Sequence, residues 1–181
     1  MTTEPADSDS FLILPEQSAG VYSPAIDVFY REEQVPQSHS HRVSQSPLKP
    51  RYFMKHLENT PCQSCILLKS DWPPLDREDF LIAHTTEYVD AFFSGVAPLR
   101  SSNGLGWSPE FAESIRFNNA SLFHSIRSAV LKPSTICLSP TSGFHHAVPT
   151  CGGGFCTFSG QVVSSIKILR EFGLRGAYLD L

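Results

Sequence analysis

Two adjacent histidines, His145 and His146, are the residues of this sequence best suited to acid–base chemistry. They lie in a loop rich in glycine, serine and proline, residues 139–156, which follows an apolar run at 135–138 that is typical of a buried strand. The unperturbed pKa of histidine, about 6.5, allows proton exchange near neutral pH, and neighbouring imidazoles can hold different protonation states. The pair therefore predicts proton transfer. The alternative is that one histidine packs locally and the other faces solvent.

A strand–helix–strand unit is expected to position these histidines. Apolar residues recur at helical spacing over residues 161–172, and Gly173 is a typical helix stop. Residues 176–181 form the apolar run of a central parallel strand that contains Asp180. Because parallel strands joined by a helix end at the same edge of a sheet, the carboxylate of Asp180 can meet an imidazole N–H at that edge, and such a contact fixes the tautomer of a histidine. A buried aspartate that caps a backbone turn is the alternative.

The earlier part of the chain adds the other elements of an α/β fold. A β-branched and aromatic run predicts a core strand within residues 21–30. Start and stop residues predict four helices, which cover residues 50–57, 77–83, 84–93 and, after the N-cap Ser108, residues 109–130.

This arrangement of residues resembles the central block of the histone deacetylase family, which includes acetylpolyamine amidohydrolases and acetoin-utilisation proteins. The resemblance rests on Gly143-Phe-His-His-Ala147, on Gly154-Phe-Cys156, on the helix that follows and on Ala177-Tyr-Leu-Asp-Leu181. It is close over the last part of the chain and looser before it. It implies a three-layer α/β fold of the arginase/deacetylase type, with a mostly parallel sheet flanked by helices.

The resemblance also implies an activity, the hydrolysis of an acetyl amide on a lysine side chain or a polyamine. In that activity His146 would be the proton shuttle, and His145 together with Asp180 would tune it. The substrate channel would be shaped by Gly154 and Phe155, and its rim would include Trp107. A phosphate-binding loop at the triple glycine is disfavoured because no Gly-Lys-Ser/Thr follows it.

Zinc is the cofactor that the resemblance implies. The family pattern continues Asp-x-Asp-x-His, and its second Asp and its His bind the metal, whereas this sequence reaches only Asp180-Leu181. We therefore expect a fragment, residues 20–181 being the N-terminal part of a deacetylase domain. Zn²⁺ would be held by ligands downstream of Leu181 and by none within this chain, which alone should not catalyse. The alternative function is a non-catalytic protein of the same fold that binds acyl-lysine or another partner.

Composition sets the outer limits. The chain has 181 residues, 41% hydrophobic and 18% charged, which predicts one soluble domain after a mobile tail at residues 1–19. A net charge of -4 disfavours direct nucleic-acid binding, and no apolar run approaches the roughly 18 residues of a membrane span. An odd number of cysteines and the lack of a signal peptide predict a cytoplasmic, reducing compartment.

A few further residues have two interpretations each. Cys62 and Cys65 have half the spacing of a zinc knuckle, but reduced, partly buried thiols are the simpler interpretation. His39 and His41 could chelate a metal, but without a third ligand nearby they are expected in a solvated loop.

Arg51 and His84 are also open to interpretation. Arg51 follows two prolines as in the entry motif of the resembling family, so it could line the inner end of an acetate pocket or be a surface arginine. His84 is expected to be a structural hydrogen-bonding residue.

Overall fold

The computed structural model describes residues 25–37 and 44–180. The expected mobile tail at residues 1–19 and the pair His39 and His41 lie outside the described residues.

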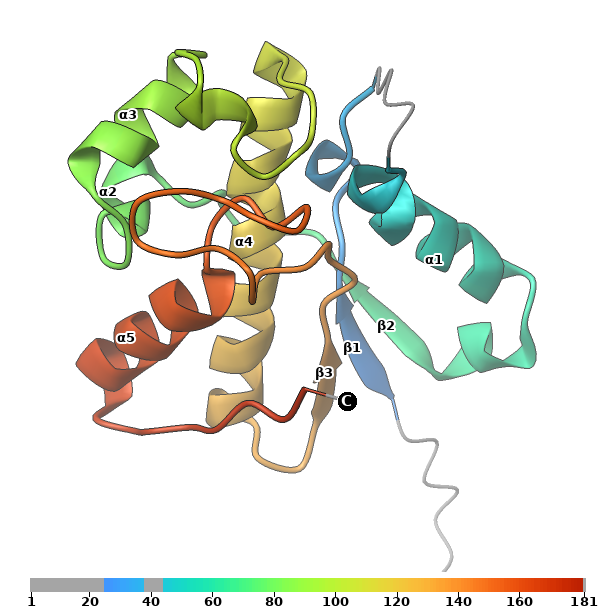
Figure 1. The fold of residues 1–181 in the computed structure, drawn as a ribbon. Coiled ribbons are helices and arrows are strands. Elements are labelled where there is room, and N and C mark those ends of the chain that lie inside the picture. Colours follow the sequence, from blue (N-terminus) through green and yellow to red (C-terminus); the bar gives the residue numbers. More distant parts are fainter. Residues whose placement is uncertain (1–24, 38–43, 181) are drawn as a thin grey trace, which may run out of the picture.

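A parallel three-stranded sheet forms the centre of the molecule. Its strands are β1 (Ile26–Phe29), β2 (Ile66–Lys69) and β3 (Ile136–Leu138), in the order β2-β1-β3 (Figure 1). Both neighbours run parallel to β1, and Val28 in the middle strand is fully buried. The apolar runs predicted within 21–30 and at 135–138 are therefore strands, whereas β2 was not predicted.

Helix α1 (Lys49–Glu58) covers one face of the sheet. Pro50 lies in its first turn, where the missing N–H group breaks no helical hydrogen bond. A small apolar cluster joins the two layers and consists of Val28, Tyr30 and Val35, with Ile26, Leu48, Met54, Ile66 and Leu138 packed against it.

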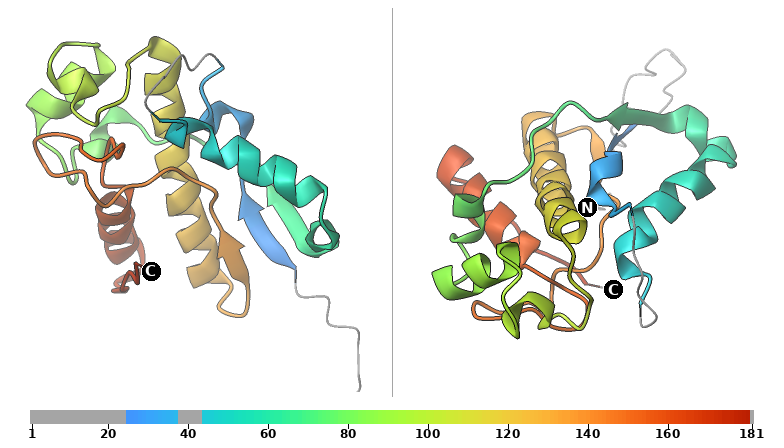
Figure 2. Two further views of the ribbon diagram at one scale, coloured as in Figure 1. Left: turned by 45° about the vertical axis from the view of Figure 1, so that its right-hand side comes forward. Right: turned by 90° about the horizontal axis from the view of Figure 1, so that it is seen from above.

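The long helix α4 (Pro109–Leu131) covers the opposite face, so the sheet lies between α1 and α4 (Figure 2). Ser108 starts it as predicted, because its hydroxyl accepts a hydrogen bond from the N–H of Phe111 at 3.1 Å. The main apolar core forms around α4, α5 (Gly160–Phe172) and α3 (Thr86–Phe93), with the short helix α2 (Arg77–Phe80) at its edge. This three-layer α/β arrangement agrees with the predicted fold class.

The predicted central strand at residues 176–181 is wrong for the part that the structure describes. Gly173 ends α5 in the left-handed conformation, with φ of 69°, and the residues from 174 to 180 continue without strand pairing. The hydroxyl of Tyr178 donates a hydrogen bond to the carbonyl of Gln161 on α5, at 2.9 Å. This contact holds the segment along the helices, and within the described ranges β3 pairs with β1 alone.

None of the helices within 25–37 and 44–180 is both long and apolar enough to cross a membrane.

Candidate functional site

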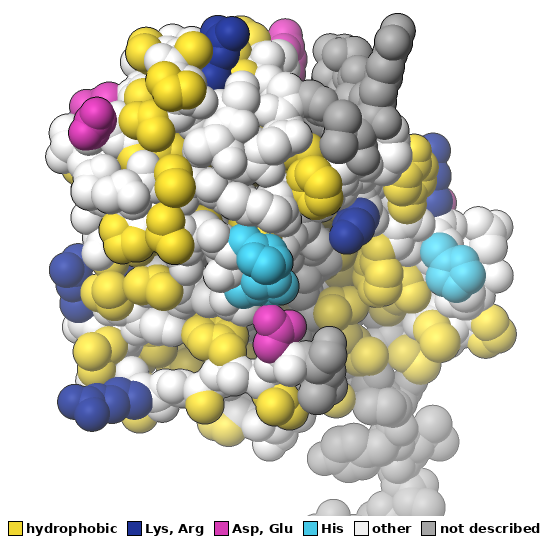
Figure 3. Space-filling view, in the orientation of Figure 1, with side chains coloured by type: hydrophobic (Ala, Val, Ile, Leu, Met, Phe, Trp, Pro, Cys, Tyr) yellow, Lys and Arg dark blue, Asp and Glu magenta, His cyan; other side chains and the backbone are white. Residues whose placement is uncertain are grey.

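The two imidazoles of the sequence prediction lie side by side in the loop after β3. Their ring centroids are 4.1 Å apart and the ring planes are inclined by 60°. Asp180 joins them, with its Oδ2 atom 3.1 Å from Nδ1 of His145. Figure 3 shows histidine side chains near the middle of one face of the molecule, next to an acidic side chain and bordered by apolar ones. The structure thus brings these three residues together, although Asp180 arrives from an extended segment and not from a strand.

The site is open to solvent. The side chain of His145 is 48% exposed and that of Asp180 is 69% exposed. When Asp180 accepts the Nδ1 proton of His145, the Nε2 atom of that ring keeps a lone pair and can take up a proton. The arrangement can therefore bind or transfer a proton at the surface of the loop.

Gly154 makes room for the ring of His146. Its φ is +51°, and a Cβ atom added there would lie 2.5 Å from Cδ2 of His146, so a larger residue would displace the imidazole. The next residue, Phe155, also has a positive φ, 67°, which costs a non-glycine residue about 1–2 kcal/mol. Its N–H donates to the carbonyl of Asn103 at 2.9 Å, and its ring is 37% exposed. The ring lies next to Gly104, 3.8 Å from where a Cβ atom on that glycine would be, and a residue with such a strained backbone is a feature of functional loops.

Cys156 is buried and packs against Gly143 of the same loop. A Cβ atom on Gly143 would lie 2.9 Å from the Sγ atom of Cys156, so glycine is needed at this contact too. Burial raises the pKa of the Cys156 thiol, which keeps it protonated and weakly reactive.

His84 links the middle of the histidine loop, residues 139–156, to the start of α5. Its Nε2 atom accepts the N–H of Ser159 at 2.9 Å, so the ring proton is on Nδ1, which lies 3.0 Å from the carbonyl oxygen of Val148. Burial lowers the pKa of His84, and hydrogen bonds to backbone carbonyls offset only part of this effect. His84 is therefore a neutral structural residue, as predicted.

Asn103 and Tyr88 hold the glycine segment, residues 152–157, and the sequence interpretation missed both. Asn103 is 2% exposed, donates from Nδ2 to Oγ1 of Thr157 at 2.8 Å, and accepts the N–H of Leu105 at 2.9 Å. The hydroxyl of Tyr88 donates to the carbonyl of Thr157 at 2.6 Å. The Asn-Gly pair at 103–104 predicts a flexible loop, yet these bonds anchor it, and only its turn chemistry was visible in the sequence.

Polar side chains from α4 and from the 3-10 helix η1 (Glu32–Gln34), which follows β1, anchor the first half of the histidine loop. Three hydrogen bonds of 2.6–3.0 Å do this: Asn118 Nδ2 to Ser142 Oγ, Ser121 Oγ with Ser139 Oγ, and Gln34 Nε2 to the carbonyl of Pro140. The first half of the loop is therefore fixed by α4 and by η1.

Trp107 and Arg51, two further candidates, have their contacts elsewhere. The indole N–H of Trp107 donates to the carbonyl of Phe92 at 2.7 Å, and its ring fills the space over Gly95 at the end of α3. The Nε atom of Arg51 lies 3.1 Å from Oε2 of Glu32. These contacts place Trp107 in the packing of α3 and favour the surface interpretation of Arg51.

Within the described ranges, no group of three or more His, Cys, Asp and Glu side chains is arranged to hold a metal ion. His145 and Asp180 contact each other and provide two such side chains, whereas a catalytic zinc site needs three protein ligands. These residues alone therefore do not fit a zinc site.

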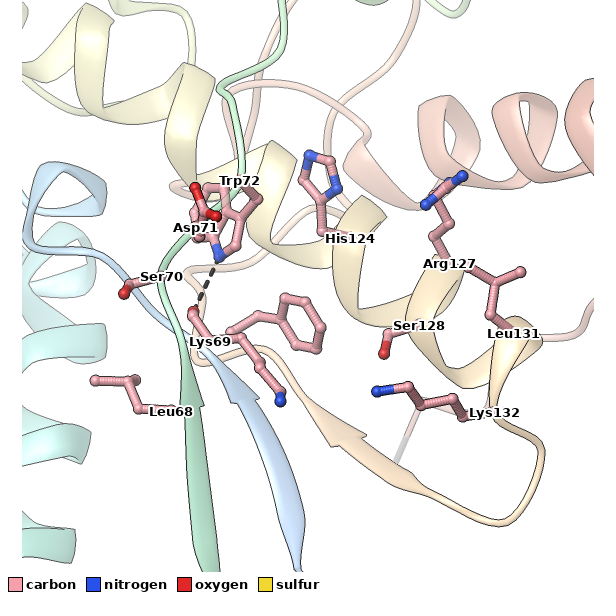
Figure 4. A pocket seen from close by; sticks show the side chains of 11 residues that line it. Leu68, Lys69, Ser70, Asp71, Trp72, His124, Arg127, Ser128, Leu131 and Lys132 are labelled. Atoms are coloured by element: carbon pink, nitrogen blue, oxygen red, sulfur yellow. Dashed lines mark hydrogen bonds between the residues drawn. The ribbon is translucent and has the colours of Figure 1, made fainter.

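A groove of about 430 Å³ lies on the α4 side of the sheet and does not include the imidazole pair (Figure 4). Its cationic side chains have carboxylate partners. Lys69 and Lys132 lie 3.6 and 3.9 Å from the carboxylate of Asp27, and Arg127 pairs with Glu171 at 2.6 Å. The groove therefore presents paired charges and offers no clear site for an anion.

No family model matches this sequence, and no curated protein matches it. Among solved structures, the chain is similar to the crystal structure of the HDA15 HD domain, a histone deacetylase domain, with a TM-score of 0.64 and 15% sequence identity. The match covers 80% of this chain and 42% of that chain, so this chain spans less than half of the solved domain. The similarity shows a deacetylase-like fold.

Proposed function

We propose that this chain carries the proton-transfer residues and the substrate-channel wall of an amidohydrolase that removes acetyl groups from lysine side chains or polyamines. The main support is the contact of Asp180 with His145. His145 and its neighbour His146 lie in the loop that follows a parallel strand of a deacetylase-like fold. The likeness to a solved deacetylase domain supports the fold, and the paired imidazoles support the chemistry.

Each of the three side chains has a defined part in this proposal. In this role Asp180, whose Oδ2 atom lies 3.1 Å from Nδ1 of His145, would hold that ring in one tautomer. His146 takes a proton from the attacking water and returns it to the leaving amine, which departs as acetate forms. His145, in contact with the ring of His146, orients it during both transfers.

Gly154 and Phe155 form the wall beside the imidazoles in this proposal. The missing side chain of Gly154 lets its backbone lie against the ring of His146, since a Cβ atom there would lie only 2.5 Å from Cδ2 of that ring. The half-exposed ring of Phe155 offers an apolar surface for the aliphatic linker of an acetylated lysine or polyamine. Trp107 is not included, because it packs on α3.

Zn²⁺ is the cofactor that we propose for the full-length protein. Because the described residues do not make a three-ligand site, other residues would have to hold the metal. No step above depends on it.

The test is acetate release by the natural full-length protein with added Zn²⁺. One assay uses an acetyl-lysine peptide and a second uses an acetylated polyamine, which separates the two substrate classes. We expect His146→Ala to lower kcat/KM at least about 100-fold, the usual contribution of general acid–base catalysis. His56→Ala is the control, because His56 is exposed on α1. Equal activity of the His146→Ala variant and the wild type would exclude the proposed role.

A second function, binding of acyl-lysine without catalysis, is favoured by the lack of a three-ligand cluster within the described ranges. Calorimetric titration of the 181-residue chain with an acetyl-lysine peptide tests it, with the unacetylated peptide as control. Selective binding of the acetylated peptide, together with no acetate release in the assay of the full-length protein, would support this function over the amidohydrolase.

A further inference from the structure

Cys62 and Cys65 are two free thiols in one short surface turn, far along the chain from the imidazole site. They lie in the 3-10 helix η3 (Pro61–Cys65), which connects α1 to the edge strand β2 (Figure 1). Cys62 is exposed and Cys65 is half-buried. The other three cysteines are less accessible than Cys62, and Cys156 among them is buried.

The geometry of the turn places Cys62 and Cys65 on the same side of the 3-10 helix. A 3-10 helix has three residues per turn, so side chains at positions i and i+3 eclipse each other. With a rise of about 2 Å per residue, the Cα atoms of Cys62 and Cys65 are roughly 6 Å apart, inside the range of about 4.4–6.8 Å for disulfides. Backbone bonds hold this shape, from the N–H of Gln63 to the carbonyl of Thr60 and from the N–H of Ile66 to the carbonyl of Gln63.

We propose that Cys62 and Cys65 form a thiol–disulfide exchange site, which a low-molecular-weight disulfide such as oxidised glutathione converts into an intrachain disulfide. The thiolate of Cys62, the more exposed residue, attacks one sulfur of the oxidant, whose S–S bond breaks and releases one glutathione thiolate. The thiolate of Cys65 then attacks the Cys62 sulfur of the mixed disulfide and releases the second glutathione. The protein loses two electrons and two protons, and the oxidant becomes two molecules of reduced glutathione. The bond locks the turn that leads into β2.

The sequence allows a direct test by mass spectrometry. Cleavage by trypsin after Lys55 and Lys69 places both cysteines in one peptide, residues 56–69, while Cys137, Cys151 and Cys156 fall in residues 128–167. The folded 181-residue chain is treated with oxidised glutathione, quenched in acid, alkylated and digested. We expect peptide 56–69 without alkyl groups and lighter by two hydrogen atoms, and full reversal by dithiothreitol.

Single substitutions distinguish the roles of the Cys62 and Cys65 thiols. In Cys65→Ser, glutathione should accumulate on Cys62, because the second attack is lost, while Cys62→Ser should gain much less adduct. Cys137→Ser is the control and should behave as the wild type, since Cys137 lies on β3.

The contribution of the fold is measured by comparing the folded chain with the chain unfolded in urea. In glutathione redox buffers we expect an equilibrium constant for disulfide formation at least about tenfold higher in the folded chain, because the turn raises the effective concentration of one thiol at the other. Equal constants, or peptide 56–69 with two alkylated or two glutathione-bearing cysteines, would overturn the proposal.

Discussion

Replacing His84 by phenylalanine should destabilise the fold, because it removes both hydrogen bonds that link the middle of the histidine loop to the start of α5. The ring is 5% exposed, so the N–H of Ser159 and the carbonyl of Val148 would lose their partner with little access to water. An unsatisfied buried group costs about 1–3 kcal/mol, and the Val148 bond is only partly buried, so we expect a loss of about 2–4 kcal/mol in the free energy of unfolding at pH 7.5.

The size of this loss should depend on pH, with a sign fixed by the burial of His84. Burial lowers the pKa of His84 in the folded state below its unfolded value of about 6.5. Between these two pKa values the unfolded chain binds more protons, so wild-type stability is fully present above about pH 6.5 and falls as the pH decreases towards the folded pKa. The slope is at most about 1.4 kcal/mol per pH unit for one group. The phenylalanine variant lacks this titration, so the two proteins should become more alike at low pH.

Urea denaturation followed by tryptophan fluorescence is a suitable assay, since Trp72 is buried in the core. His124 also has its pKa lowered by burial, but it is present in both proteins, so the difference between them isolates His84. His56→Phe, at an exposed position on α1, is the control and should change stability by no more than about 0.5 kcal/mol. The reasoning is refuted if His84→Phe matches this control at pH 7.5, or if the difference from wild type stays constant between pH 7.5 and 5.5.

Further predictions concern the glycine segment and its support. Gly154→Ala should cost at least about 1–2 kcal/mol from its positive φ alone and should shift the NMR signals of the His146 ring, whereas Gly176→Ala, with open space around it, should do neither. Unchanged His146 signals in the Gly154 variant would contradict the close contact. Asn103→Ala should lower the free energy of unfolding by about 1–3 kcal/mol in the same urea assay, because it leaves buried partners unsatisfied, while the exposed Asn59→Ala should lower it far less. An equal effect of the two asparagine variants would show that the loop does not depend on Asn103.

Local signals were enough to predict most helix boundaries. Ser108 starts α4 and Gly173 ends α5 as predicted, because capping depends on residues within one turn of the helix end. The strand β2 was missed for the opposite reason. Its four residues form a short run whose strand character depends on pairing with β1, about forty residues earlier in the sequence.

The contact between Asp180 and His145 was predicted, but the strand that was expected to position Asp180 is absent from residues 174–180. The sequence interpretation brought it to His145 through a parallel strand, but the segment from 174 to 180 is extended and unpaired, and it is held along α5 by Tyr178. The chain direction after Gly173 still leads Asp180 back towards β3. The contact therefore depends on the path of this segment and not on the strand pairing that was expected.

The two halves of the candidate site are held to different degrees. The loop that carries the imidazoles is fixed by buried side chains from several elements, with His84 bonded to Val148 and Ser159 and Asn103 bonded to Thr157. Asp180, in contrast, follows a run of exposed residues and is itself 69% exposed. Rigid placement by a second layer of hydrogen bonds is what acid–base chemistry requires of its imidazoles. The hydrogen bonds above fix the loop that carries His145 and His146 without Asp180, so the carboxylate is the less firmly placed part of the candidate site.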